Sequence, residues 1–320
     1  MKHKLFFSFV LTCIVILLVL IGCSGAATDS TLISSTSISG ASLSENPSTE
    51  SSPDATNTAP KSTESTSIPT TTKIVTKETT SIVTYQVAFV ADDNELNVRA
   101  DSGTNYEILT SLAHNVDNIH VIGSGKRVQD IFWVPINYPG GSGWASRYYL
   151  TESVTSDAFC SDPNIQTLIE DLRIVIEHHD GGGLANLIYY ERGLLIRHDW
   201  WNEEVHLEQD AVEQFFSSET RHYWGEASGS GLSINGSITE TIIPFLEKDL
   251  LADVETKCNE IIGGGTAGIL RLPSEYDSFN FISLYRAGEE DFDWGTWVVG
   301  IEFWDRVPYL VFLVHYQWEI

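Results

Sequence analysis

The sequence predicts a multidomain chain in which a small all-β domain is followed by an α+β domain with a mainly antiparallel sheet. Residues 24–84 are rich in Ser and Thr and contain no aromatic residue, so a polar linker precedes the folded part. Residues 85–152 contain short apolar runs between Gly- and Pro-containing turns, which is typical of strands. Residues 160–320 begin with apolar positions at helical spacing and end in two long apolar runs, which indicates helices before strands.

The chain begins with an apolar segment that ends at a cysteine. Residues 5–21 follow a lysine-containing start and lead into Leu20-Ile21-Gly22-Cys23. This ending resembles the lipobox of bacterial lipoproteins, whose cysteine becomes the lipidated N-terminus. The resemblance implies a signal peptide over residues 1–22, lipid on Cys23, and a protein held at the extracytoplasmic face of the cell membrane. An ordinary secretory signal or an uncleaved membrane helix is the alternative.

Residues 23–84 form the expected linker. Of the 61 residues from 24 to 84, 30 are Ser or Thr. Such a segment has too little apolar surface to offset the entropy of ordering its backbone. We therefore expect a disordered tether between the lipid and the folded part. A tract so rich in hydroxyl groups is also a candidate for O-linked sugars.

Residues 85–152 are expected to form the all-β domain. Residues 96–99 alternate apolar and polar side chains, and residues 101–105 have the composition of a turn. Further strand-like runs follow at 119–122, 132–136 and 143–145.

Three segments of this domain carry a family resemblance. The runs "LNVRADSGTNYEIL", "FWVPI" and "GWASRYYL" occur in this order and resemble the bacterial SH3 (SH3b) family. The chain departs from the family at Asp101-Ser102, where Gly-Pro is common. The resemblance implies a compact, partly open β-barrel that binds peptidoglycan, a peptide or another envelope component through a shallow aromatic groove.

Four aromatic residues are the candidate ligand contacts of this groove. Trp133 and Trp144 lie on expected strands, where aromatic side chains more often belong to the core than to a binding surface. Tyr106 and Tyr148 suit either role. Arg99, near the start of a strand, is expected to pair with a nearby acid.

Residues 160–320 are expected to form the α+β domain. Asp162-Pro163 predicts a helix start, and the glycines after Asp180 are expected to end that helix. The apolar runs 296–304 and 309–318 flank a turn and predict a β-hairpin. Because both faces of this hairpin are apolar, we place it at the centre of the sheet. Shorter helices are expected within 184–188, 207–216 and 242–250, and strands at 193–200, 204–207 and 269–272.

The chain is strongly acidic, with a formal net charge of −26. Residues 153–320 alone hold 30 acidic and 9 basic side chains. Phosphate backbones and anionic lipid head groups repel such a surface, so we expect no nucleic-acid partner. A basic protein partner is compatible with this charge.

Two of the four cysteines lie outside the N-terminal segment. Cys13 lies in the expected signal peptide and Cys23 is the lipid site, which leaves Cys160 and Cys258. Two remaining thiols outside the cell often pair. The sequence leaves this disulfide open, because it does not give the distance between the two residues.

Catalytic and metal-binding motifs are not evident in the sequence. Neither Cys160 nor Cys258 has the surroundings of a peptidase nucleophile, and no His-Glu-x-x-His pattern occurs. The run from Gly263 to Gly268 matches a dinucleotide-binding pattern, but a strand rather than a helix is expected after it. The acids of residues 289–293 faintly suggest calcium, yet the other ligand positions of a calcium loop are missing. We therefore expect no cofactor, with calcium as the alternative.

These patterns predict a non-catalytic, lipid-anchored surface protein. Its binding to peptidoglycan or another envelope component is assigned to residues 85–152. The alternative is an envelope hydrolase whose carboxylates lie within residues 160–320, because spacing in sequence does not give the distance between two carboxylates in a fold.

Overall fold

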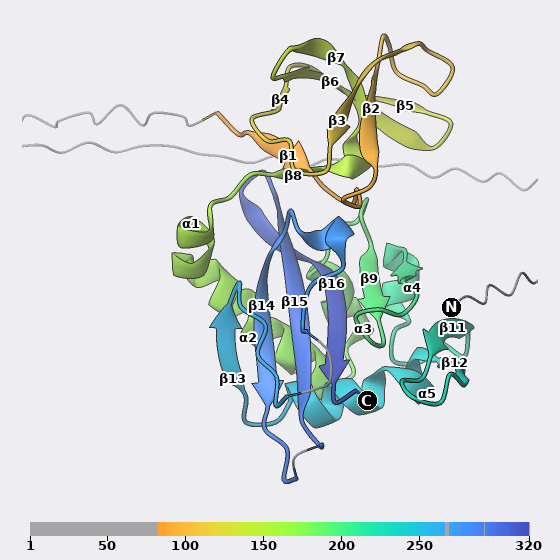
Figure 1. The fold of residues 1–320 in the computed structure, drawn as a ribbon, viewed down its shortest axis with the longest axis vertical. Helices are drawn as coiled ribbons and strands as arrows, with labels where there is room; N and C mark the ends of the chain where they lie inside the picture. The colour runs from red at the N-terminus through yellow and green to blue at the C-terminus, as the bar shows by residue number, and fades with distance from the viewer. Residues whose placement is uncertain (1–81, 266–268, 291, 320) are drawn as a thin grey trace, which may run out of the picture. The chain divides into compact units, whose positions relative to one another are not determined.

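The computed structural model describes residues 82–265, 269–290 and 292–319. The expected signal peptide, Cys23 and nearly all of the expected linker lie outside these ranges. The described residues belong to one compact unit, which is mostly antiparallel sheet with a few helices (Figure 1). Within these ranges, every helix is too short or too polar to traverse a bilayer.

The first sheet is built from short strands of residues 95–146. Its order is β3-β2-β7-β6-β4, and β5 pairs with β6. In β2, Leu96 and Val98 are buried while Asn97 is exposed, as the two-residue period of a strand requires. The expected strands at 96–99, 119–122, 132–136 and 143–145 are confirmed. The bounds are β2 Glu95–Arg99, β3 Ile108–Ala113, β4 His120–Val121, β5 Lys126–Val128, β6 Ile131–Tyr138 and β7 Gly141–Ser146.

A separate two-stranded ladder joins the two ends of this region. Strand β1 (Tyr85–Val87) pairs antiparallel with β8 (Leu150–Glu152), and the short 3-10 helix η1 (Arg147–Tyr149) leads from β7 into β8. The core of the region is a cluster of aliphatic side chains. Its fully buried members are Val87, Val98, Ile119, Ile136, Ala145 and Leu150.

The second sheet has six strands in the order β10-β9-β16-β15-β14-β13. The hairpin of β15 and β16 lies in the middle, as expected, and Asp305 and Arg306 form its two-residue turn with positive φ angles of 50° and 66°, which suits a type I′ turn. Strand β9 runs parallel to β16 and the other pairs are antiparallel. The bounds are β9 Leu194–Arg197, β10 Val205–Leu207, β13 Glu255–Cys258, β14 Asn280–Arg286, β15 Gly295–Trp304 and β16 Val307–Gln317.

Both faces of this central hairpin are covered. Trp297 and Val299 pack into the cluster that includes helix α2 (Pro163–Glu177), whereas Val298 packs into a second cluster with Tyr276 and Phe279. The pairing register shifts between Gly300 and Ile301. Leu310 lies in the first cluster whereas Phe312, Val314 and Tyr316 lie in the second, because this bulge interrupts the two-residue alternation of β16.

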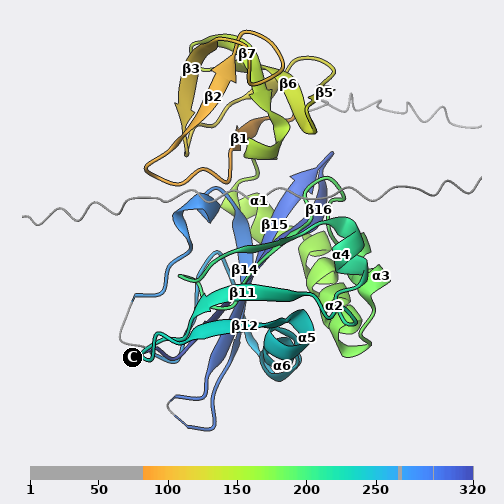
Figure 2. The same cartoon turned by 90° about the vertical axis from the view of Figure 1, so that its right-hand side faces the viewer.

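The helices lie against the second sheet (Figure 2). Asp162 accepts a hydrogen bond from the backbone N–H of Asn164 and Pro163 is the first residue of α2, which confirms the expected start. The glycines after Asp180 do more than end α2. They form the first turn of α3, where Gly183 N–H donates to Asp180 Oδ1 at 2.8 Å. The bounds are α1 Ser156–Ser161, α2 Pro163–Glu177, α3 Gly181–Asn186, α4 Gln209–Glu213, α5 Ile238–Thr241, α6 Ile243–Phe245, the π-helical η2 Leu246–Leu250 and the 3-10 helix η3 Ser274–Tyr276.

Two parts of the second region differ from the expectation. Strands β11 (Arg221–Glu226) and β12 (Ser233–Ser237) form a two-stranded sheet of their own that the sequence pattern did not indicate. Residues 269–272 are irregular rather than a strand. Two of their apolar side chains, those of Leu270 and Leu272, pack against the cluster on the second face of the hairpin, whereas Ile269 is exposed.

Candidate functional site

A hollow of about 400 Å³ opens on the first sheet region, and we call it the Trp133 hollow. Aromatic side chains from three different elements line it: Phe89 after β1, Trp133 on β6 and Tyr149 in η1. Polar side chains complete the lining, namely Asn94, Glu95, Asn97, Arg99, Thr104 and Ser146. The hollow therefore offers flat apolar surface beside amide and hydroxyl groups, which suits a peptide or a sugar.

Trp133 is the most buried of the three aromatic residues that line this hollow. Its position on β6 is fixed by pairing with Ser146 of β7 on one side and Lys126 of β5 on the other. Its side chain is only 4% exposed, and its indole Nε1–H is buried with no hydrogen-bond partner in the described part of the chain. Buried indole N–H groups usually have an acceptor. This N–H is buried in the fold, and other atoms of the Trp133 side chain line the hollow.

The charged groups of the hollow have different roles. Arg99 Nη1 donates to the carbonyl oxygens of Thr104 at 2.9 Å and Tyr106 at 2.8 Å, so it holds the 100–107 loop against β2. The expected pairing of Arg99 with an acid is wrong, because its guanidinium donates to these two carbonyl oxygens and forms no ion pair with an acid of the described residues. Glu95 is exposed and forms no ion pair with the described residues, so its carboxylate is available to a cationic group of a ligand.

The four aromatic candidates do not meet in one site. Trp133 lines the Trp133 hollow, whereas Tyr148 lines a second hollow. Trp144 is partly buried on β7, with the Lys126 ammonium 4.5 Å from its ring centre. Tyr106 lies in the 100–107 loop with 47% of its surface exposed, outside the lining of either hollow.

Phe89 and Tyr149 were missed by the sequence reasoning. Tyr149 stands beside Tyr148 in the "RYYL" segment, and the centres of their rings are 5.1 Å apart, but only Tyr149 also lines the Trp133 hollow. Phe89 has a positive φ of 54°, which is unusual for a bulky residue. Neither feature leaves a periodic signal in the sequence.

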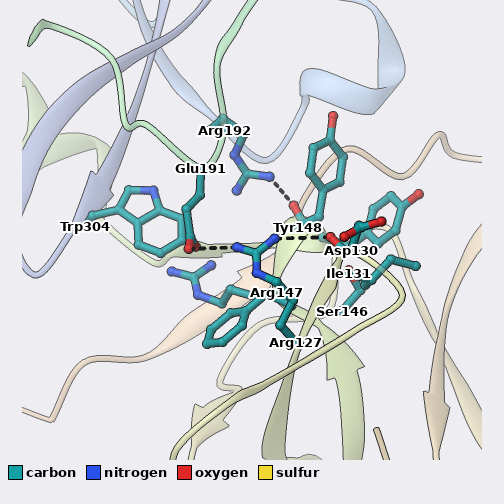
Figure 3. A pocket seen from close by; sticks show the side chains of 11 residues that line it. Arg127, Asp130, Ile131, Ser146, Arg147, Tyr148, Glu191, Arg192 and Trp304 are labelled. Atoms are coloured by element: carbon teal, nitrogen blue, oxygen red, sulfur yellow. Dashed lines mark hydrogen bonds and ion pairs between the residues drawn. The ribbon is translucent and has the colours of Figure 1, made fainter. Parts of the chain in front are cut away.

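The second hollow, of about 270 Å³, contains three arginines, and we call it the arginine hollow (Figure 3). Arg127 comes from β5, Arg147 from η1, and Arg192 from the segment before β9. The wall is completed by Tyr148, Trp304, and the acids Asp130 and Glu191. It shares Ile131, Ser146 and Tyr149 with the Trp133 hollow, so the two hollows adjoin.

Burial shifts the pKa of two groups in the arginine hollow. Burial raises the pKa of Tyr148 to about 12, although the charge of Arg192 opposes this shift. Its hydroxyl therefore stays neutral at physiological pH. Burial lowers the pKa of Arg147 from its ordinary value, and the nearby charge of Arg192 lowers it further. Arg147 still carries its charge, because the ordinary arginine pKa is far above neutrality.

The buried carboxylates of residues 160–319 are engaged by other side chains. Asp249 Oδ1 accepts from Arg286 Nε at 2.6 Å, and its Oδ2 accepts from His315 Nε2 at 2.9 Å. Asp199 accepts from Gln317 at 2.9 Å and is 2.8 Å from His198 Nδ1. A hollow of about 340 Å³ is lined by Asp92 and Asp277 together with Trp200 and Arg271. Burial raises the pKa of Asp277 above its ordinary value. The hydrolase alternative stays a prediction.

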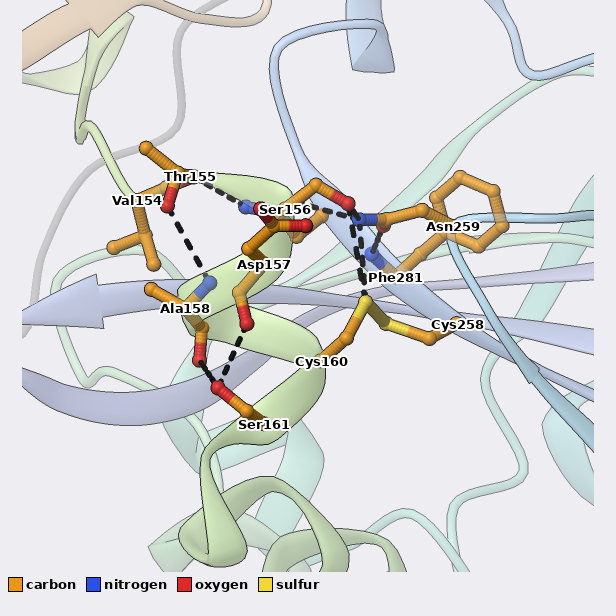
Figure 4. Close-up of a disulfide and its surroundings, with 11 residues drawn as sticks. Val154, Thr155, Ser156, Asp157, Ala158, Cys160, Ser161, Cys258, Asn259 and Phe281 are labelled. Atoms are coloured by element: carbon orange, nitrogen blue, oxygen red, sulfur yellow. Dashed lines mark hydrogen bonds between the residues drawn. A yellow bond between two sulfur atoms is a disulfide. The ribbon is translucent and has the colours of Figure 1, made fainter.

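A disulfide joins Cys160 of α1 to Cys258 of β13, with a Cα–Cα distance of 5.8 Å (Figure 4). Asn259 supports it from the side. Its Nδ2 donates to Ser156 Oγ and to Asn280 Oδ1, both at 2.8 Å, and its Oδ1 accepts from the backbone N–H of Phe281 at 2.9 Å. The disulfide therefore links α1 covalently to β13, an edge strand of the second sheet.

In the described ranges, no group of three or more His, Cys, Asp or Glu side chains is arranged to hold a metal ion. Asp291, one of the candidate calcium ligands, lies outside these ranges. Asp293 is contacted by Lys248 Nζ at 2.5 Å and by Arg286 Nη1 at 3.6 Å. Two cations at this carboxylate favour an ion-pair network there.

No family model, curated protein or solved structure matches the chain. The SH3b and lipoprotein resemblances therefore rest on the sequence segments that carry them, and the chemistry of the two hollows rests on the geometry above.

Proposed function

We propose that residues 85–152 are an SH3b module of a lipid-anchored surface protein, and that the module binds a peptide-bearing component of the cell envelope, such as peptidoglycan, in the Trp133 hollow. The observation that carries this proposal is the open hollow in which the aromatic side chains of Phe89, Trp133 and Tyr149 lie beside polar side chains.

The lining of the hollow fits a peptide better than an apolar small molecule. Phe89 and Tyr149 provide rigid, flat surface that loses little entropy on binding. Asn94 and Asn97 carry side-chain amides that both donate and accept, as a peptide backbone requires. Glu95 adds one negative charge that would attract an amine of the ligand. This combination suits the binding of a peptide ligand, for which no catalytic group is required.

The strand arrangement is compatible with an autonomous module. The β1–β8 ladder brings the first and last residues of the region side by side, with Tyr85 opposite Glu152. A region whose ends meet is easily placed between a linker and a second region. The aliphatic cluster around Val98 and Ile136 gives it a core of its own.

The proposed anchor gives the module its reach. Lipid on Cys23 would hold the chain at the membrane, and a coil of the 61 residues from 24 to 84 would span on the order of 45 Å between its ends. That length would let the folded part search the envelope near the membrane. The acidic surface disfavours adhesion to anionic head groups.

Co-sedimentation with purified cell walls tests the proposal. We expect the wild-type chain to sediment with the walls and Trp133→Phe to bind about fivefold more weakly, because the smaller ring removes aromatic contact of about 1 kcal/mol from the lining. Trp201→Phe is the matched control, since Trp201 is 39% exposed and lies outside the lining of both hollows. Equal binding by wild type and Trp133→Phe would contradict the proposal. Release of soluble wall fragments would instead favour the hydrolase.

A further inference from the structure

The arginine hollow stands out against the charge of the chain. The protein has 44 acidic and 18 basic residues, of which ten are arginines, yet three arginines line this one hollow of about 270 Å³. Their side chains converge from three separate segments of the chain (Figure 3). Cationic side chains that repel one another are brought together only where other interactions compensate.

Arg147 is the residue whose charge is least compensated. Its side chain is 5% exposed, and it forms no ion pair with any described residue. Its Nη1 donates to the carbonyl oxygen of Leu150, and its guanidinium stacks on Trp304 at 3.8 Å and on Tyr85 at 4.7 Å. The Tyr85 side chain also shares a hydrogen bond with it. A guanidinium has five N–H donors. Around the guanidinium of Arg147, neutral groups and aromatic rings stand where a carboxylate would usually be.

The other two arginines differ in how freely they can respond to a ligand. Arg192 is fixed, since it donates to both carboxylate oxygens of Glu302 and to the carbonyl oxygens of Tyr148 and Leu150. Arg127 is more than half exposed and is held by Glu191 Oε1 at 3.2 Å and the Asp130 carbonyl oxygen at 3.3 Å. A surface ion pair of this kind contributes little, so a ligand carboxylate would readily replace Glu191.

The arginine hollow adjoins the Trp133 hollow through Ile131, Ser146 and Tyr149, which line both. One extended ligand could therefore occupy the two hollows together. Glu95 lies in the lining of one hollow and the arginines in that of the other. The charges would thus orient a peptide with its amine at Glu95 and its carboxylate at the arginines.

We infer that the arginine hollow binds the terminal carboxylate of a peptide whose body occupies the Trp133 hollow, with Arg147 as the buried partner and Arg127 as the exposed one. The inference rests on the proposed function, because it assumes a peptide ligand in the Trp133 hollow. It narrows the ligand class to peptides with a free carboxylate end. A planar carboxylate matches the fork of a guanidinium, and stacking on Trp304 keeps the plane of Arg147 fixed.

Titration of the full chain in detergent micelles tests this inference. The probes are a synthetic tetrapeptide with a free amine and a free carboxylate, the same tetrapeptide as its C-terminal amide, and inorganic phosphate. We expect the amide to bind about ten- to a hundredfold more weakly than the acid, which is the range for hydrogen bonds to a charged group. Phosphate should compete only weakly, because it lacks the peptide body.

Variants assign the effect to the hollow. In Arg127→Gln and in Arg147→Lys we expect the preference for acid over amide to shrink about fivefold or more. Arg221→Gln, at an exposed ion pair elsewhere in the chain, should keep it unchanged. Arg127 is largely exposed, so Arg127→Gln remains informative if Arg147→Lys fails to fold.

The possible failures are distinguishable. Equal binding of acid and amide, with both weakened by Trp133→Phe, would overturn the carboxylate assignment and leave the Trp133 hollow as the binding site. Phosphate binding more tightly than the acid would show that the arginines serve a phosphate-bearing ligand and would also overturn it. Absence of saturable binding of the acid overturns it as well, whereas the wall co-sedimentation reports separately on the proposed function.

Discussion

The guanidinium of Arg192 donates three hydrogen bonds of 3.0 to 3.2 Å to the carboxylate of Glu302, and both side chains are almost fully buried. The same guanidinium donates to the carbonyl oxygens of Tyr148 and Leu150. A second contact lies nearby. The Glu152 carboxylate accepts hydrogen bonds from the backbone N–H groups of Asp305 at 2.7 Å and Arg306 at 3.2 Å. These contacts join the first sheet region to the central hairpin and give the arginine hollow a fixed frame.

Breaking this buried pair should be strongly destabilising. Glu302→Ala would leave the Arg192 guanidinium buried without its carboxylate, and we expect the free energy of unfolding to fall by about 3–5 kcal/mol. Urea unfolding at neutral pH measures this change. Glu255→Ala, at the exposed Lys257–Glu255 pair, should change stability by less than about 1 kcal/mol. Similar losses in the two variants would show that the buried pair contributes no more than an exposed one.

The long apolar elements were predictable because their signals are local. The β15–β16 hairpin was predicted at the centre of the sheet, since runs that are apolar on both faces must be covered on both faces. Helix α2 was predicted from its cap and from apolar positions at helical spacing. The register shift between Gly300 and Ile301 was not predicted, because a single extra residue in one strand leaves no periodic signal in the sequence.

The two hollows could not be predicted from the sequence. Arg192 and Trp304 lie 40 or more residues after Glu152, the last residue of β8, and nothing in their neighbourhood marks them as partners of Arg147. Strand β12 was missed because it contains two serines, an asparagine and a glycine, which are typical of turns. Trp133 was a candidate because it is an aromatic residue on an expected strand, and its role in binding stays a prediction; its unpartnered N–H is a property of the fold alone.

The disulfide should contribute strongly to stability because of the length of chain it closes. Cys160 and Cys258 are 98 residues apart in the sequence. The loop-entropy relation gives about 4–5 kcal/mol for a loop of this length. We expect Cys160→Ser combined with Cys258→Ser to lower the free energy of unfolding by about that amount in urea titrations. A reductant should destabilise the wild type and leave the double variant unchanged. Two reactive thiols in the denatured, unreduced wild type would contradict the pairing.

The stability of the protein should fall below about pH 4 because of Asp249. Burial alone would raise the pKa of this carboxyl, but hydrogen bonds and charges from His315 and Arg286 outweigh burial and hold the pKa below its ordinary value of 3.8. A carboxyl with a lowered folded pKa stabilises the fold above its unfolded pKa, and this contribution is lost as the pH falls through the folded pKa. Urea midpoints between pH 6 and pH 2 measure the loss. Asp249→Asn should be less stable at pH 6 and should show a weaker dependence between pH 4 and pH 2. An unchanged pH dependence in Asp249→Asn would rule out Asp249 as the source.

Gly300 should tolerate no larger residue. A Cβ at this position would lie 2.2 Å from Cε1 of the buried Phe312 ring. The ring is enclosed by the second cluster and cannot withdraw without displacing its neighbours, so we expect Gly300→Ala to destabilise by about 1–3 kcal/mol. Gly182→Ala is the matched control, because a Cβ there would make only an ordinary contact of 3.6 Å with Asp180 in the first turn of α3. A melting temperature for Gly300→Ala equal to that of Gly182→Ala would contradict the close packing of the central hairpin.

Attachment to the membrane should depend on Cys23 and not on the other cysteine of the N-terminal segment. If acyl chains on Cys23 hold the protein, Cys23→Ala removes the acceptor and the processed chain should appear in the soluble fraction, because stable anchoring requires more than one weak membrane contact. Cys13→Ala changes a cysteine within the expected signal peptide and should leave the chain membrane-bound. Fractionation with immunodetection, together with the mass of the mature N-terminus, measures both variants. A Cys23→Ala chain that has lost its first 22 residues and still sediments entirely with membranes would show that the attachment lies elsewhere, either in the folded region or in a protein partner.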